Sequence, residues 1–145
     1  MSTQNKQTAL IGFGTVGQGF FHYLEENKED KQLATVVIKN ASKSRVPDSL
    51  NFSTDVNDVY QNKEITTVVE LISDYEQAFS IVKQALLQGK QVVSSNKKMI
   101  AYHLEELVEL EQNSKGNFLY EGAVAGSIPI LKIINEQYAF NEITE

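Results

Sequence analysis

Three glycines with a fixed spacing follow the first apolar run of the chain. The segment from Gln7 to Ile11 has the composition of a short strand, and from Val16 to Leu24 the apolar residues return at helical intervals. Between them lies the sequence GFGTVG at positions 12–17. A strand that passes directly into a helix through such a loop favours a fold built from strand–helix–strand units.

Each glycine of this loop meets a different steric demand. Gly12 permits a tight turn, Gly14 lets the main chain approach a pyrophosphate, and Gly17 lets the helix pack closely on the strand. A helix that begins near Thr15 also directs free amides and the positive end of its dipole at phosphate groups. The loop therefore predicts a dinucleotide-binding site, and the alternative is a glycine turn that serves packing alone.

Strands and helices alternate along the rest of the chain. Strands are expected at residues 7–11, 33–38, 66–72, 91–95 and 118–120, and helices at 16–24, 55–61, 73–88, 104–115 and 128–139. The third of these helices is expected to begin with a capping box formed by Ser73 and Glu76. The pattern predicts an α/β fold with a doubly wound, mostly parallel, Rossmann-like sheet in one dinucleotide-binding domain over residues 1–145.

Composition excludes several classes of function. The 145 residues include no cysteine and two histidines far apart, His22 and His103, which argues against thiol chemistry and imidazole metal sites. A net charge of −6 is unfavourable for binding nucleic acid. No apolar run approaches the ~18 residues of a membrane span, and the first six residues are polar. We therefore expect a cytoplasmic protein with a small-molecule ligand.

The second strand lacks the acidic residue that would bind the ribose hydroxyls of NAD. Between Leu33 and Pro47 there is no Asp or Glu, and the loop instead carries Lys39, Lys43 and Arg45. Positive charge at this place suits the 2′-phosphate of NADP. The sequence predicts NADP preference or tolerance of both coenzymes, and the alternative is a solvated basic loop.

Two further strand ends are rich in polar or small residues. Ser73 follows one strand, and Ser95, Asn96 and Lys97 follow the next, at the edge where open α/β sheets bind ligands. We expect these residues to contact the coenzyme. The segment 121–129 follows the last strand and is rich in small residues. Such residues either let the main chain approach a ligand or serve close packing alone. Glu70, within a strand, is either catalytic or hydrogen-bonded to the backbone.

Three motifs together give a family resemblance. The sequences GFGTVGQG, VVSSNKKMIA and FLYEGAVAGSIPIL, in this order and spacing, resemble the amino-terminal nucleotide-binding region of homoserine dehydrogenase over nearly the whole chain. The resemblance implies NAD(P)-dependent interconversion of L-homoserine and L-aspartate 4-semialdehyde, on the route to threonine and methionine. It also implies a homo-oligomer in the full-length form.

The resemblance assigns roles to single residues. Phe13, Thr15 and Val16 would meet the coenzyme phosphates through main-chain groups, and Lys97 would face the nicotinamide and substrate side, in catalysis or in coenzyme contact. The segment after the last strand resembles a loop that holds a monovalent cation such as sodium, with a structural role as the alternative; the ligands would be Glu121, Val124, Gly126 and Ile128.

The chain also departs from the family pattern. Ile72-Ser73-Asp74 and Gly126-Ser127 stand where Gly-Gly pairs are common, and the family's substrate domain has no counterpart before Glu145. We therefore expect part of a longer enzyme, inactive alone, whose last helix at about 128–140 belongs to the interface with the missing domain. The alternative is a regulatory module that senses a dinucleotide without catalysis.

Overall fold

Six parallel strands form a single sheet in the order β3-β2-β1-β4-β5-β6. They are β1 (Gln7–Ile11), β2 (Leu33–Val37), β3 (Phe52–Ser53), β4 (Ile65–Glu70), β5 (Gln91–Ser94) and β6 (Phe118–Leu119). The computed structural model describes residues 6–42, 47, 49–126 and 128–137. The strand order reverses between β1 and β4, which confirms the doubly wound, Rossmann-like sheet predicted from the sequence.

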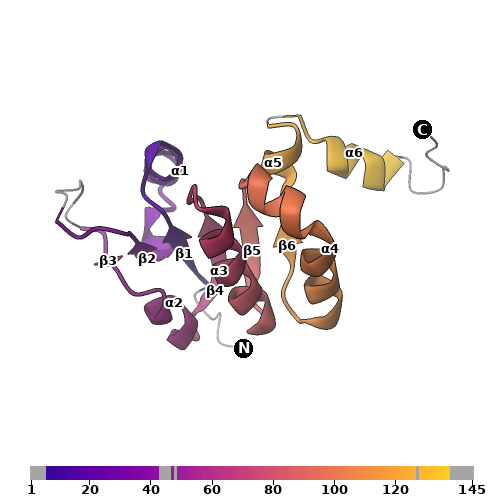
Figure 1. Cartoon of the computed structure of the whole chain (residues 1–145). Coiled ribbons are helices and arrows are strands. Elements are labelled where there is room, and N and C mark those ends of the chain that lie inside the picture. Colours follow the sequence, from indigo (N-terminus) through magenta and orange to yellow (C-terminus); the bar gives the residue numbers. More distant parts are fainter. Residues whose placement is uncertain (1–5, 43–46, 48, 127, 138–145) are drawn as a thin grey trace, which may run out of the picture.

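Helices cover both faces of this sheet (Figure 1). They are α1 (Thr15–Glu26), α2 (Asn57–Gln61), α3 (Tyr75–Leu87), α4 (Lys97–Asn113), α5 (Glu121–Val124) and α6 (Ile130–Gln137), with a 3-10 turn η1 (Asp30–Gln32) before β2. One face packs against α1, and the other packs against α2, α3 and α4. Successive residues of β1 serve the two faces in turn, because side chains alternate along a strand: Leu10 packs with α1, and Ile11 packs with the helices opposite.

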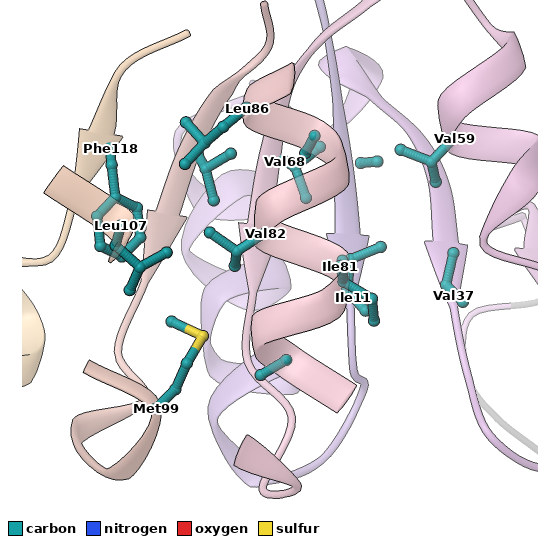
Figure 2. Packing of buried hydrophobic residues seen from close by; sticks show 14 of the residues in the cluster. Ile11, Val37, Val59, Val68, Ile81, Val82, Leu86, Met99, Leu107 and Phe118 are labelled. Carbon is teal, nitrogen blue, oxygen red and sulfur yellow. The ribbon is translucent and has the colours of Figure 1, made fainter. Parts of the chain in front are cut away.

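The larger core lies between the sheet and the pair α3 and α4 (Figure 2). Val68 of β4 and Val82 and Leu86 of α3 are fully buried there, and Leu107 of α4 packs in the same cluster as Phe118 of β6. Burial of one such side chain contributes about 1.5–3 kcal/mol. This core fixes α3 and α4, and therefore their amino-terminal ends, relative to the strands.

Several expected boundaries are wrong. The helix α4 begins at Lys97 instead of Leu104, because Asn96 caps it by accepting a hydrogen bond from the N–H of Met99 at 3.0 Å. The cap of α3 is Asp74, which accepts the N–H of Gln77 at 3.0 Å, so the predicted Ser73–Glu76 capping box does not form. The short β3 and α5 were not expected, and the last helix begins at Ile130, two residues late.

Candidate functional site

The glycine loop joins β1 to α1 through contacts that leave no room for side chains at two of its positions. Gly12 has a φ of 98°, and a β-carbon there would lie 2.9 Å from the carbonyl oxygen of Leu71. A β-carbon on Gly17 would lie 2.3 Å from the carbonyl oxygen of Gly12. The turn and close-packing roles predicted for Gly12 and Gly17 are therefore confirmed.

Gly14 differs from the other two glycines of the loop. A β-carbon on Gly14 would meet no atom within 4 Å, and its φ of −82° is open to any residue. Its position as the cap of α1 therefore requires no glycine for internal packing. Open space beside the main chain is what a bound pyrophosphate would need.

The first turn of α1 presents unused hydrogen-bond donors. The first intrahelical bond runs from the N–H of Gln18 to the carbonyl oxygen of Gly14 at 2.9 Å, and no side chain caps the helix. In the described part of the chain, no group accepts a hydrogen bond from the N–H of Thr15 or Val16. Free amides at the start of a 12-residue helix are the arrangement that favours an anion.

The side chain of Phe13 is part of the core and leaves only the main chain of this residue open to a ligand. Its ring is 9% exposed and packs edge-on against Phe52, with 5.3 Å between centroids, and against Phe21 at 6.1 Å. The expectation of a main-chain role for Phe13 agrees with this burial.

The end of β2 lies beside the glycine loop. The N–H of Gly12 donates to the carbonyl oxygen of Val37 at 2.9 Å, two residues before the exposed Lys39. Lys39 is thus placed next to the loop, as the NADP hypothesis requires. Lys43 and Arg45 lie outside the described residues.

A hydrogen-bond network joins the ends of β4 and β5. The buried carboxylate of Glu70 accepts the N–H of Ile72 at 2.7 Å and the hydroxyl of Ser94 at 2.5 Å. Asn96 donates its side-chain amide to the carbonyl oxygen of Ile72 at 3.0 Å. Of the two expectations for Glu70, the structure therefore shows the hydrogen bond to the backbone.

Burial is the main electrostatic effect on Glu70. Desolvation raises the pKa of its carboxyl, while hydrogen bonds from Ser94, Ile72 and Asn96 oppose the rise. Glu70 is 0% exposed, so its carboxylate contacts other protein groups and not solvent.

The expected coenzyme contacts at these two strand ends differ in their surroundings. Ser73 and Lys97 are exposed, Ser95 and Asn96 are half-buried, and Lys97 is the first residue of α4. Sequence reasoning missed the part played by Ser94 in the network. The signal was present, because alternation along β5 buries Val92 and Ser94 and turns Gln91 and Val93 outward.

Aromatic residues cover the seam between α3 and α4 near the same edge. Tyr75 and Tyr102 stack with 5.2 Å between centroids, and the ammonium of Lys98 lies 4.1 Å from the ring centroid of Tyr75. His103 stacks on Phe79 at 3.9 Å, where the backbone of α4 departs from helical angles. Lys98 is thus exposed and also contacts an aromatic ring, and His103 packs between α3 and α4.

The segment after β6 folds back on its own acidic residue. The carboxylate of Glu121 accepts the N–H of Leu131 at 2.9 Å and that of Lys132 at 3.2 Å, so it caps α6. The carbonyl oxygen of Ile128 accepts the N–H of Ile130 at 2.8 Å. Val124 and Gly126, the other expected cation ligands, keep carbonyl oxygens for which no partner is found among the described residues.

The predicted site residues that the structure describes follow strands whose carboxyl ends lie at one edge of the sheet, including Gly12 to Gly17, which follow β1 there as the glycine loop. Because all strands are parallel, the segments after β1, β2, β4, β5 and β6 begin at the same edge, and the strand order reverses between β1 and β4 there. Within the described ranges, no three His, Cys, Asp or Glu side chains gather as a metal site. None of the helices in these ranges is long and apolar enough to cross a bilayer.

A cavity of about 390 Å³ lies at the opposite edge and has a different character. The buried ammonium of Lys90 donates there to the carbonyl oxygens of Ile65 at 2.6 Å and Asn62 at 3.2 Å. Burial lowers the pKa of Lys90. These bonds make Lys90 a structural tie between β4 and the turn before β5.

Comparison with known proteins gives a consistent result. A family model described as "Homoserine dehydrogenase, NAD binding domain" matches residues 12–121. Homoserine dehydrogenase of Pseudomonas aeruginosa is 34% identical over 145 residues, which cover 94% of this chain and 33% of that protein. The enzyme of Lactococcus lactis is 32% identical, with 94% of this chain and 35% of that protein covered.

Solved structures agree with the sequence comparisons. The crystal structure of a homoserine dehydrogenase from Thiobacillus denitrificans superposes with a TM-score of 0.80 at 34% identity, over 90% of this chain and 32% of that one. The chain thus spans about a third of the length of the relatives that it matches.

Proposed function

The chain belongs to the NAD-binding domain family of homoserine dehydrogenases, and from this membership we propose that its glycine loop binds the pyrophosphate of NAD(P). The observation that carries the proposal is the first turn of α1, where Thr15 and Val16 offer amides without partners in the described chain beside an open Gly14. Phe13 contributes main-chain groups, and Ser73, Ser95, Asn96 and Lys97 lie at the neighbouring strand ends. Calorimetric titration with NADPH and NADH tests the proposal, and a folded chain that binds neither would refute it.

We propose that NADP is the preferred coenzyme. The support is the absence of Asp and Glu between Leu33 and Pro47 and the place of Lys39 beside the glycine loop, with Lys43 and Arg45 farther along. Arg45→Ala should lower the affinity for NADPH about tenfold, which is the effect of one charge-assisted hydrogen bond, and leave the affinity for NADH unchanged. Lys115→Ala, beyond α4, is the control. Equal wild-type affinities for the two coenzymes, with no loss in Arg45→Ala, would contradict the preference.

We infer that the whole enzyme to which this domain belongs oxidises L-homoserine to L-aspartate 4-semialdehyde, as a homo-oligomer. Lys97 supports the inference, because an exposed lysine at the start of α4 can stabilise a developing alkoxide or move a proton as hydride is transferred. The oxidised coenzyme, when bound, would accept the hydride.

Activity measurements test this inference. The 145-residue chain alone is expected to bind NADPH and yet show no NADP reduction with homoserine, since the matched region covers a third of the relatives. In the full-length protein, Lys97→Met should lower kcat by a larger factor than it weakens the binding of NADPH. A full-length protein that binds NADPH but does not oxidise homoserine would refute the assignment.

We also propose that main-chain oxygens of Val124, Gly126 and Ile128, together with Glu121, bind a monovalent cation. Oxygen ligands suit such a hard ion. The two hydrogen bonds that Glu121 accepts from α6 oppose its participation, so the cation would compete with this cap. Thermal unfolding in sodium chloride and in tetramethylammonium chloride at equal ionic strength tests the proposal. Equal melting temperatures in the two salts, for the wild type and for Glu121→Gln alike, would contradict it.

A further inference from the structure

Four residues at the ends of β4 and β5 form a closed ring of hydrogen bonds. One carboxylate oxygen of Glu70 accepts the N–H of Ile72, and the other accepts the hydroxyl of Ser94. Ser94 Oγ accepts the N–H of Asn96 at 3.1 Å, and the side-chain amide of Asn96 donates to the carbonyl oxygen of Ile72. The ring therefore fixes the two strand ends relative to each other.

The centre of this ring is costly to bury. Glu70 is 0% exposed and Ser94 is 1% exposed, and Glu70 follows Val68 and Val69 on β4 and pairs with Ile11 of β1. A buried carboxylate opposes folding unless its oxygens are hydrogen-bonded, and an apolar residue would fill the same space without that cost. The stability of the fold alone does not explain a carboxylate at this position, which points to a function for the groups that it holds in place.

On one side, the ring holds the wall of the glycine loop. Ile72 Cγ2 would lie 2.9 Å from a β-carbon on Gly12, so Ile72 packs directly against the turn of the loop. Glu70 and Asn96 fix the N–H and the carbonyl of Ile72, respectively. Ile72 also packs against the larger core, so the turn of the loop has a support that does not depend on the ring.

On the other side, the ring sets the start of α4. Asn96 donates its backbone N–H to Ser94 and its side-chain amide to the carbonyl oxygen of Ile72, and its side-chain oxygen caps α4 by accepting the N–H of Met99. Lys97 is the next residue and the first of the helix. The direction in which α4 presents Lys97 therefore depends on the ring.

We propose that Glu70 is a positioning residue for the nicotinamide half of the coenzyme: its carboxylate, through Ser94 and Asn96, places the start of α4 and Lys97 at the coenzyme edge. The proposal rests on the proposed binding of NAD(P) at this edge. It separates two parts of the ligand. The pyrophosphate and adenosine half depends on α1 and β2, whereas the nicotinamide half depends on the ring.

The test compares the whole coenzyme with a fragment that lacks nicotinamide. Calorimetry gives the affinity of the chain for NADPH and for 2′-phospho-ADP-ribose, in the wild type and in Glu70→Gln. The glutamine keeps the shape of the side chain but removes its charge and turns one acceptor into a donor, so the ring loses its charged acceptor. We expect about a tenfold loss for NADPH, the worth of one hydrogen bond to a charged group, and less than about a twofold change for the fragment.

Two further variants keep the test decisive. Ser94→Ala opens the ring at another point, and we expect the same loss for NADPH and the same small change for the fragment. This variant also provides the test if Glu70→Gln does not fold. Thr35→Val is the matched control, because Thr35 is buried on β2 and accepts a hydrogen bond from Asn51 at 3.3 Å outside the ring. It should change neither affinity.

Each outcome points to one conclusion. Equal losses for NADPH and the fragment in a folded ring variant would reduce Glu70 to a structural residue and overturn the inference, as would unchanged NADPH affinity in both ring variants. A wild-type chain that binds neither ligand would refute the proposed function itself, and the inference with it. A loss confined to NADPH supports the positioning role.

Discussion

Alanine at Gly14 should separate coenzyme binding from folding. The new β-carbon has no atom within 4 Å, so it meets no steric cost in the folded chain. Alanine caps a helix less well than glycine but lowers the entropy of the unfolded chain, and these opposing effects should leave the free energy of unfolding within about 1 kcal/mol of wild type. The methyl group nevertheless fills the space in which the phosphates would lie.

The expected loss of affinity follows from the amides that this methyl group would shield. If the pyrophosphate loses one or two charge-assisted hydrogen bonds to Thr15 and Val16, NADPH should bind about 10- to 100-fold more weakly in Gly14→Ala. Urea unfolding followed by circular dichroism gives the stability, and calorimetry gives the affinity. NADPH affinity equal to that of wild type in a folded Gly14→Ala would refute the reasoning that places the phosphates here.

Two other glycines of α1 supply the controls. In Gly17→Ala the β-carbon would lie 2.3 Å from the carbonyl oxygen of Gly12, so α1 must move away from β1. Overpacking of this kind costs about 1–3 kcal/mol, and binding should fall together with stability. Gly19 is exposed with open space around it, and Gly19→Ala should gain about 1 kcal/mol of helix stability without changing the affinity for NADPH.

Three predictions concern buried or capping charges. Burial raises the pKa of Glu70 above 4.5, so the folded chain holds this proton more tightly than the unfolded chain, and the contribution of Glu70 to stability falls as pH rises from about 4.5 through the folded pKa. Urea unfolding at about pH 5 and about pH 8 should therefore favour wild type over Glu70→Gln more at the lower pH, and an equal difference at both would contradict this. Lys90→Met removes the donor to two main-chain carbonyl oxygens and should lower the free energy of unfolding in urea by about 1–3 kcal/mol. The control Lys31→Met, at an exposed position, should lower it by less than about 0.5 kcal/mol. Equal effects of the two variants would show that the buried hydrogen bonds do not stabilise the fold. Asp74→Ala loses the cap that accepts the N–H of Gln77 and should lower the free energy of unfolding by about 1 kcal/mol, and an unchanged melting curve would show that water replaces the cap.

Local steric demands made the fold class and the glycine loop readable in the sequence. Helix α1 packs against the turn that precedes it, and this close packing requires a glycine at position 17. Strands that alternate with helices through short connections favour a parallel sheet. The matched family confirms that assignment. The roles expected for the individual coenzyme and cation ligands stay predictions.

The tertiary structure decided which polar residues act together. Glu70 and Ser94 lie 24 positions apart and meet because β4 pairs with β5, and Glu121 caps a helix that begins nine residues later. Asn96 caps α4 instead of entering a loop, and Met99 and Ile100, which α4 buries, lie at helical spacing from Leu104 and Leu107. Sequence patterns report which side chains an element buries, whereas hydrogen bonds between elements depend on the register in which those elements pack, and only the folded chain sets that register.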